Sequence, residues 1–348
     1  MSSLATAIPT GSWVLVTGAS GFLASHVSLQ FLGRGYKVRG TVRDPATSSW
    51  LKEGPFKQYA DAGNIELVSV PDLGADGAFD EAIKGVTAVL HIAYVTNIVS
   101  DPNEVITPLV NSVRSIITAA TKEPSVKEVV FTGSALNTSP LTPHVDNGVI
   151  GRHSWNDDVL KAAWAPPPYD PSRAMLNYPA SKTAAEKEVW KLVEDNELHF
   201  NVSVVSPAGI TGEPLNQKHI DGPANWVMHG YRGHKAVMDS LQSTFYADVK
   251  DVALVHVAAV LDPEVRNARI NSWGISTHWN EILAMFRKFR PERKFVDDYP
   301  EPFHLQVSVD QSDAVALLKK WSDDPEKNGW RSMEESIYDN INNPYVEE

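Results

Sequence analysis

Two side chains that can handle a proton stand four residues apart in the segment Tyr178-Pro-Ala-Ser-Lys182. If this segment begins a helix, the spacing places the phenol and the ammonium group on one face, with their Cβ atoms about 5–6 Å apart. A free tyrosine has a pKa of about 10, which is too high for acid–base chemistry at neutral pH. A neighbouring ammonium group stabilises the phenolate, so we expect Lys182 to lower the pKa of Tyr178. The pair then suits proton transfer to an alkoxide.

A third candidate, Ser134, follows the predicted strand at 128–132. Functional groups of open α/β sheets lie beyond the carboxyl ends of the strands, so this hydroxyl is placed to hydrogen-bond a substrate carbonyl. Taken alone, a Tyr-x-x-x-Lys pattern is common by chance, and a serine after a strand is usually a turn residue. The joint occurrence of both features after a glycine-rich turn is far more specific.

That turn follows the first predicted strand, in Trp13-Val-Leu-Val-Thr-Gly18-Ala-Ser-Gly21-Phe-Leu-Ala24. Gly18 permits a tight turn, Gly21 lets backbone N–H groups approach a pyrophosphate, and Ala24 allows the helix to pack closely on the strand. The N-terminus of the helix then offers the positive end of its dipole to the phosphates. The pattern predicts a dinucleotide site, and a glycine-rich turn without a ligand is the alternative.

The end of the second predicted strand distinguishes NAD from NADP. An NAD site normally has an acidic residue there, whereas Val38-Arg39-Gly40-Thr41-Val42-Arg43 is basic and the first acid is Asp44. Arg43 can form a bidentate contact with a 2′-phosphate, which favours NADP(H) over the alternative of a solvated surface arginine. After the third strand, Asp72 and Leu73 are placed to hold the adenine, although an ordinary acidic loop fits them equally well.

The elements that must position these residues alternate between strand and helix. We predict strands at 13–17, 37–42, 65–70, 88–92, 128–132 and 201–205, and helices at 21–32, 104–120 and 179–195. This alternation indicates an α/β fold with a Rossmann-type doubly wound parallel sheet and a smaller C-terminal substrate-binding lobe. Residues 1–206 are predicted to form the NADP(H)-binding domain with the catalytic residues. Residues 207–348 are mainly the smaller lobe, with helices at 251–261, 279–289, 310–321 and 331–342 and with some segments returning to the first domain.

Composition excludes several other classes of protein. The 348 residues carry a formal net charge of −12, which disfavours binding to nucleic acid. There is no cysteine, so disulfides, thiolate metal sites and cysteine nucleophiles are excluded. The scattered histidines, of which His229 and His234 are the nearest pair, predict no metal site. We find neither a signal peptide nor a run of about 18 apolar residues, which predicts a cytoplasmic protein without a membrane span.

Over nearly its whole length the chain resembles the extended short-chain dehydrogenase/reductase family. The likeness is strongest to the branch of dihydroflavonol reductases, cinnamoyl-CoA reductases and fungal or yeast NADPH-dependent aldehyde and ketone reductases. The segments that carry it are Val14–His26, Gly35–Arg43, His91–Ala93, Tyr178–Lys182, Asp251–His256 and Gly329–Ser336.

By that resemblance Ser134, Tyr178 and Lys182 form the catalytic triad. The resemblance implies NADP(H) as the cofactor, with Arg43 at the 2′-phosphate and Pro207 over the nicotinamide. The full set of expected cofactor-binding residues is Gly18, Ser20, Gly21, Phe22, Leu23, Arg43, Asp72, Leu73, Ala93, Thr132, Tyr178, Lys182 and Pro207.

The chain departs from the family pattern at two positions. Thr132-Gly-Ser134 stands where the family usually has Thr-Ser-Ser, and Ala46-Thr-Ser-Ser49 replaces a basic residue that often follows Arg43. The second departure weakens the assignment of NADP. Asn111 matches the asparagine that relays protons in some short-chain reductases, but a buried or capping amide explains it better.

These observations predict an NADPH-dependent carbonyl reductase that transfers a hydride to an aldehyde, ketone or keto ester, with Tyr178 as the proton donor. A nucleotide-sugar epimerase or dehydratase, or a non-catalytic redox sensor of the same fold, is the alternative. The substrate is expected to be a small carbonyl compound, and the protein a monomer or homodimer. The apolar pocket is assigned to Ala135, Tyr169, Ile210 and Trp226, although such aromatic side chains also occur simply as core.

Overall fold

The computed structural model describes residues 4–94, 99–222 and 225–346. The chain divides into two compact units. Unit 1 comprises Met1–Pro140, His153–Ser206 and His256–Ile270, and unit 2 comprises Leu141–Arg152, Pro207–Val255 and Asn271–Glu348. Within the described part of the chain, every helix is too short or too polar to span a lipid bilayer.

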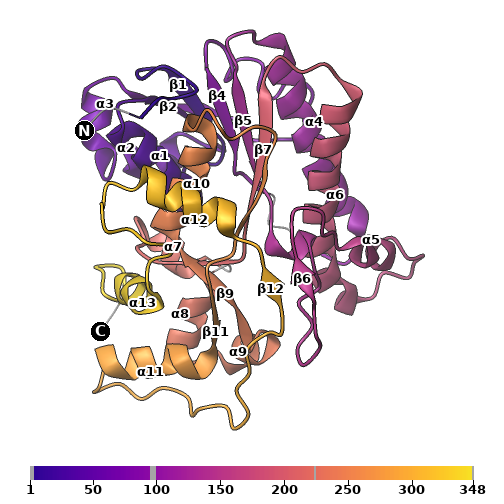
Figure 1. The fold of residues 1–348 in the computed structure, drawn as a ribbon, viewed down its shortest axis with the longest axis vertical. Helices are drawn as coiled ribbons and strands as arrows, with labels where there is room; N and C mark the ends of the chain where they lie inside the picture. Colours follow the sequence, from indigo (N-terminus) through magenta and orange to yellow (C-terminus); the bar gives the residue numbers. More distant parts are fainter. Residues whose placement is uncertain (1–3, 95–98, 223–224, 347–348) are drawn as a thin grey trace. The chain divides into compact units, whose positions relative to one another are not determined.

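Unit 1 is built on a seven-stranded sheet with the strand order β10-β7-β5-β4-β1-β2-β3 (Figure 1). The pairings from β7 through to β3 are all parallel. The strands span Trp13–Val16 (β1), Lys37–Val42 (β2), Ile65–Ser69 (β3), Ala88–His91 (β4), Glu128–Thr132 (β5), Asn201–Pro207 (β7) and Arg269–Ser272 (β10). The predicted doubly wound α/β fold is therefore confirmed.

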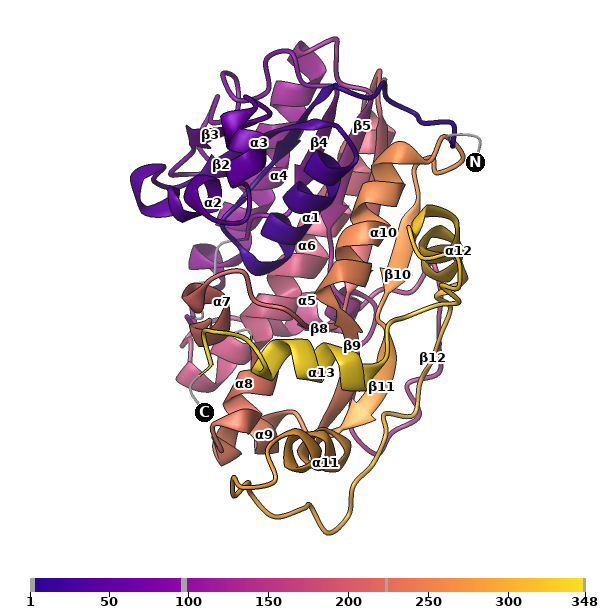
Figure 2. The same cartoon turned by 90° about the vertical axis from the view of Figure 1, so that its left-hand side faces the viewer.

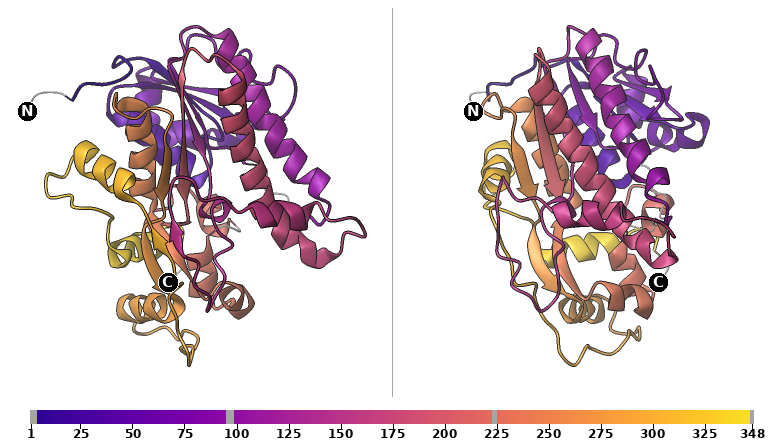
Figure 3. Two further views of the ribbon diagram at one scale, coloured as in Figure 1. Left: turned by 45° about the vertical axis from the view of Figure 1, so that its right-hand side comes forward. Right: turned by 90° about the vertical axis from the view of Figure 1, so that its right-hand side faces the viewer.

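Helices cover both faces of this sheet. Figure 3 shows α4 (Ile106–Lys122) and α6 (Ala174–Asp195) side by side on one face, and α1 (Phe22–Gly33) lies on the other. The buried side chains of α4 recur at Ile106, Leu109, Val113, Ile116 and Ala120, which is the spacing of an amphipathic helix. The main core lies between the sheet and this helical layer, and it includes Leu15, Phe79, Val89, Val129 and Val202.

The shorter elements of unit 1 lie mostly after the strands. They are η1 (Ala46–Ser48), α2 (Trp50–Glu53), α3 (Lys57–Asp61), η2 (Pro102–Glu104), η3 (Ala135–Asn137), α5 (Asp157–Ala163) and η4 (Pro171–Arg173). Of these, η3 matters most for the site, because it starts directly after Ser134 and its N-cap is the serine itself.

Unit 2 contains a three-stranded and a two-stranded sheet (Figure 2). In the first, β9 (Ser243–Asp248) pairs in parallel with β8 (Gly209–Thr211) and antiparallel with β11 (Ile275–His278). In the second, β6 (Val149–Ile150) pairs with β12 (Ser308–Val309). The helices are α7 (Gln217–Asp221), α8 (Trp226–Tyr231), α9 (Lys235–Ser240), α11 (Trp279–Phe289), α12 (Ser312–Trp321) and α13 (Met333–Ile341). Helix α10 (Val249–Leu261) contributes its first residues to unit 2 and its last to unit 1.

Several features differ from the sequence-based expectations, among them the five strands of unit 2, which were not predicted. Helix α6 begins at Ala174, five residues before the predicted start, and therefore contains Pro179 in its interior. The seventh strand, β10, was not predicted. Residues 141–152 group with unit 2 because β6 pairs with β12, whereas the expected first domain ran without a break to residue 206.

Candidate active site

The three predicted catalytic residues meet within unit 1, at the carboxyl end of β5. Tyr178 and Lys182 lie one turn apart on α6, and Nζ of Lys182 donates to the backbone oxygen of Thr132 at 3.1 Å. The Tyr178 side chain hydrogen-bonds Ser134, whose Oγ also accepts the backbone N–H of Leu136 at 3.3 Å. Strand β5, η3 and α6 thus position one hydroxyl, one phenol and one ammonium group together.

The protonation of this group differs from the expectation. Burial, together with a smaller contribution from the nearby Tyr94, raises the pKa of Tyr178 to about 12, although the hydrogen bond from Ser134 lowers it. Burial also lowers the pKa of Lys182 to about 8. The pKa of Tyr178 is thus raised and not lowered as predicted, because the cost of burying a phenolate dominates. Tyr178 is held as the neutral phenol, the form that can donate a proton.

Tyr94 is a site residue that sequence reasoning missed. Its ring contacts Tyr178 edge-on with the centroids 5.3 Å apart, and Nζ of Lys182 lies 4.9 Å from its centroid. The residue directly follows Ala93, beyond the carboxyl end of β4. That position, next to β5 in the sheet, is the signal that identifies it, because strand ends in open α/β sheets face the ligand.

The glycine turn has the geometry that a pyrophosphate needs. Gly18 has a φ of +66°, and a Cβ there would lie 3.1 Å from the Cβ of Ala93. Gly21 is the N-cap of α1, and it has no side chain to cap the first N–H groups of the helix. Oγ1 of Thr17 accepts the N–H groups of Ile92 and Ala93, each at 3.0 Å, which fixes β1 against β4. These features fit a dinucleotide phosphate at the helix N-terminus, as predicted.

The predicted residues near the glycine turn differ in burial and in their contacts. Leu23 is buried, and the ring of Phe22 packs edge-on against His26 at 5.8 Å, so both residues offer the turn only their backbone. Ser20 is half-buried. Asn111 is half-buried on α4, where its Cβ lies against Gly74.

Arg43 lies exposed directly after β2, and its guanidinium forms no hydrogen bond or ion pair with the residues that the structure describes. By contrast, Arg39 within β2 pairs with Glu66 at 2.8 Å. The carboxylate of Asp44 accepts the N–H of Ala46 at 2.9 Å and so serves a turn. Arg43 is thus available for an anionic ligand.

The remaining predicted residues are distributed over both units. Asp72 accepts the N–H of Gly74 at 2.9 Å, and Leu73 packs against the main core of unit 1. Pro207 is the last residue of β7, where the chain passes from unit 1 to unit 2. Of the predicted pocket residues, Ala135 and Tyr169 belong to unit 1, and Ile210 and Trp226 belong to unit 2.

The surroundings of two of these predicted pocket residues, Tyr169 and Ala135, are defined within unit 1. The ring of Tyr169 is covered by the guanidinium of Arg173 at 5.0 Å. Ala135 is buried at the start of η3.

A buried ion pair lies behind the catalytic residues. Glu186, one turn after Lys182 on α6, accepts Nε of Arg269 at 2.6 Å, and their side chains are 2% and 5% exposed. The other carboxylate oxygen accepts Nδ2 of Asn137 at 2.6 Å. Because Asn137 ends η3, this carboxylate joins the helix that carries Tyr178 to the turn that follows Ser134. A cavity of about 20 Å³ lies beside it, lined among others by Thr132, Lys182 and Glu186.

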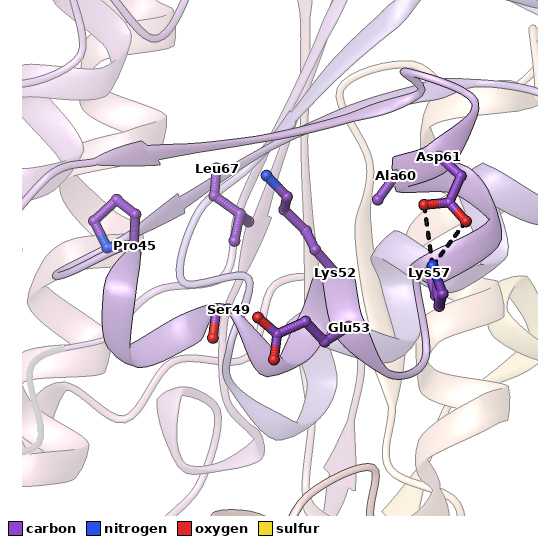
Figure 4. Close-up of a pocket in the computed structure, with 8 residues that line it drawn as sticks. All are labelled: Pro45, Ser49, Lys52, Glu53, Lys57, Ala60, Asp61 and Leu67. Atoms are coloured by element: carbon purple, nitrogen blue, oxygen red, sulfur yellow. Dashed lines mark hydrogen bonds and ion pairs between the residues drawn. The ribbon is translucent and has the colours of Figure 1, made fainter.

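A larger hollow in unit 1 is a separate feature. It has a volume of about 520 Å³, and Figure 4 shows its walls, with the Lys57–Asp61 ion pair on one side. Its lining residues are Pro45, Ser49, Lys52, Glu53, Lys57, Ala60, Asp61 and Leu67. None of these is a predicted catalytic or cofactor-binding residue, so this hollow is not the candidate active site.

Comparisons with known proteins show the family of this chain. The profile of the NAD-dependent epimerase/dehydratase family matches residues 14–271. Aldehyde reductase 2 of Sporidiobolus salmonicolor is 34% identical over 95% of this chain and 96% of its own. The NAD-dependent epimerase/dehydratase terH of Aspergillus terreus is 33% identical over 99% of this chain and 100% of its own. The structure of yeast methylglyoxal/isovaleraldehyde reductase Gre2 with NADPH matches with a TM-score of 0.77 at 23% identity, covering 95% of this chain and 97% of Gre2.

Proposed function

The chain belongs to the NAD-dependent epimerase/dehydratase family, and we propose that it is an NADPH-dependent carbonyl reductase. Its substrate is an aldehyde, a ketone or a keto ester, and its product is the corresponding alcohol. The observation that carries this proposal is the meeting of Ser134, the protonated Tyr178 and Lys182 at the carboxyl end of β5. The aldehyde reductase among the relatives supports the same reaction.

Ser134, Tyr178 and Lys182 would each have a separate role in the reduction of a carbonyl group. NADPH, when bound, supplies the hydride that the carbonyl carbon accepts. The hydroxyl of Ser134 donates a hydrogen bond to the carbonyl oxygen and orients it. As negative charge develops on that oxygen, the phenol of Tyr178 donates its proton, and the alcohol is complete. The ammonium group of Lys182 then stabilises the phenolate left behind, because the two groups lie one turn apart.

The cofactor would be held by the glycine turn and by Arg43. The N–H groups at the start of α1 would bind the pyrophosphate, and the unpaired guanidinium of Arg43 would bind the 2′-phosphate that distinguishes NADP from NAD. The basic end of β2 also argues against a nucleotide-sugar epimerase, which retains NAD. A non-catalytic sensor would not need Tyr178 and Lys182. Ala135 and Tyr169 in unit 1 remain proposed pocket residues, and Ile210 and Trp226 in unit 2 remain predictions from the sequence.

Replacing the proton donor tests the reaction. Tyr178→Phe should lower kcat by about 10²–10⁴-fold with a neutral ketone and NADPH, while NADPH affinity changes little. Tyr338→Phe, at an exposed tyrosine of unit 2, is the matched control and should retain full activity. If Tyr178→Phe keeps more than about a tenth of the wild-type kcat, Tyr178 is not the proton donor. A sugar nucleotide that turns over far better than every neutral carbonyl would contradict the proposed substrate class.

Replacing Arg43 tests the cofactor. Arg43→Ala should weaken NADPH binding by about one to two decades, because a charge-assisted hydrogen bond contributes about 1.5–3 kcal/mol. The affinity for NADH should hardly change. Fluorescence titration of both cofactors gives the comparison, with Arg39→Ala as a control at the arginine within β2. An equal loss for NADPH and NADH would show that Arg43 has a structural role instead.

A further inference from the structure

Three side chains with metal-binding atoms meet in unit 2, where β11 passes into α11. They are His278, Glu281 and His304, and their ligand atoms all lie within 4.8 Å of one another. Oε1 of Glu281 is 3.9 Å from Nε2 of His278 and 3.5 Å from Nε2 of His304. The two imidazole rings stand at 65° to each other, with their centroids 4.8 Å apart. Two nitrogens and one oxygen thus converge on a common point.

Neighbouring groups already orient two of these ligands. Oγ of Ser276 lies 3.0 Å from Nδ1 of His304 and can accept its proton, which leaves the lone pair on Nε2. The second oxygen of Glu281 accepts the hydroxyl of Thr277 at 2.7 Å and the N–H of His278 at 3.1 Å. Oε1 is thereby turned toward the two rings. Outer hydrogen bonds of this kind fix the tautomer and direction of ligands in metal sites.

We propose that His278, Glu281 and His304 form a binding site for a divalent transition-metal ion such as Zn²⁺. Two imidazoles with one carboxylate are the ligand set that suits zinc and its neighbours, whereas Mg²⁺ and Ca²⁺ prefer oxygen ligands. Ligand atoms lie about 2.0–2.2 Å from zinc, so two atoms on one ion are at most about 4.4 Å apart. Both distances to Glu281 satisfy this limit. His304 is 47% exposed, so its ring has room to complete the approach, and water can take the fourth position.

The ion would fasten a long loop to a helix. His278 and Glu281 belong to the start of α11, while His304 lies in the segment 290–307, which contains neither helix nor strand (Figure 2). The middle of this segment is already held by Arg287, which pairs with Asp298 at 2.7 Å. The ion would hold its end, just before β12. Binding to the folded state alone then stabilises that state by mass action.

The experiment compares Zn²⁺ binding by untagged full-length wild-type protein and two variants. His304→Ala removes one proposed ligand, and His153→Ala removes an exposed histidine of unit 1 as the matched control. Wild type and His153→Ala should bind one Zn²⁺ by calorimetry and unfold a few degrees higher with Zn²⁺ than with a chelator. His304→Ala should bind at least about tenfold more weakly and lose that shift.

Co²⁺ provides the spectroscopic arm of the same test. Wild type and His153→Ala should show the intense visible absorption of four-coordinate Co²⁺, and Glu281→Gln should weaken it. Equal Zn²⁺ affinity in wild type and His304→Ala would overturn the proposal and place any bound ion at other histidines. Absence of Zn²⁺ binding to the wild type would also overturn it, and the three side chains would then be an ordinary surface cluster of ion pairs.

Discussion

The two units bury charge in opposite ways. Unit 1 encloses the pair of Arg269 and Glu186 next to the candidate catalytic residues and almost out of contact with solvent. Unit 2 contains a network of ion pairs around the start of α10, in which Lys250, Arg331 and Asp339 each have two partners and several members are partly exposed. Its members are Glu213, Asp248, Lys250, Asp251, Lys327, Arg331 and Asp339.

This difference predicts in which unit the replacement of one charged side chain lowers the stability of the protein most. A buried ion that loses its hydrogen-bonded counter-ion keeps its desolvation cost without most of the attraction that offset it. In a network, another cation takes over, and exposed members return to water. We therefore expect unit 1 to be sensitive to single substitutions at its ion pair and unit 2 to tolerate them.

The largest effect should follow Arg269→Met in unit 1. Glu186 would remain buried without its cation, so the free energy of unfolding should fall by about 3–5 kcal/mol. The double variant Arg269→Met with Glu186→Leu should recover most of this loss, because two apolar side chains carry no desolvation cost. Urea unfolding followed by tryptophan fluorescence measures both. A loss below about 1 kcal/mol in the single variant would mean that water or another group compensates Glu186.

A second buried carboxylate of unit 1, that of Glu128, allows a comparison with Glu186, because it forms no salt bridge with the described residues. Glu128 on β5 accepts Nδ2 of Asn201 at 2.9 Å, and burial raises its pKa to about 7. Between its ordinary pKa of 4.5 and about 7, the folded protein holds a proton that the unfolded chain has released. The contribution of Glu128 to the stability of the folded state is therefore fully present below pH 4.5. It is lost as the pH rises through about 7.

Glu128→Gln should accordingly raise the free energy of unfolding at pH 8 by about 1–3 kcal/mol, since each pKa unit corresponds to about 1.4 kcal/mol. Near pH 4.5 the variant and the wild type should be equally stable. Glu186→Gln is the matched control, and it should destabilise the protein at pH 8 because it weakens the pair with Arg269. A Glu128→Gln effect that does not change with pH would assign the difference to packing instead.

The smallest effect is expected for Lys250→Met in unit 2. Lys250 pairs with Asp339 at 3.0 Å and with Glu213 at 2.8 Å. After its removal Arg331 still holds Asp339 at 2.6 Å, and Glu213 is exposed enough to be hydrated. The free energy of unfolding should change by less than about 1 kcal/mol. A loss as large as that of Arg269→Met would show that the two units do not differ in this respect.

Much of the fold follows from local sequence patterns. Strands such as β2 and β5 have the predicted bounds, because runs rich in β-branched residues between turn signals define buried strands. Strand β10 escaped prediction because Arg-Ile-Asn-Ser contains one large apolar residue and shows no clear period. Helix α6 begins before Pro179, although proline favours the first turn, because tertiary packing outweighs the local preference.

The features of the candidate site likewise divide into those that the local sequence predicts and those that depend on the tertiary fold. Tyr178 and Lys182 could be predicted to act together because four residues make one helical turn. The pKa of Tyr178 could not be predicted, because it depends on burial and on Tyr94, which comes from another strand end. The contact of Glu186 with Arg269 joins residues 83 positions apart, and the approach of His304 to Glu281 likewise depends on the tertiary fold. No local pattern contains such contacts.

The late place of β10 in the chain has a consequence for synthesis. Strand β10 forms one edge of the seven-stranded sheet, beside β7, and its first residue is the cation that Glu186 needs. A nascent chain that has just added Glu186 must be extended by 83 residues before Arg269 exists. At about 5–20 residues per second, this interval lasts roughly 4–16 s. Until then the edge of the sheet at β7 has no strand to pair with, and Glu186 lacks this partner.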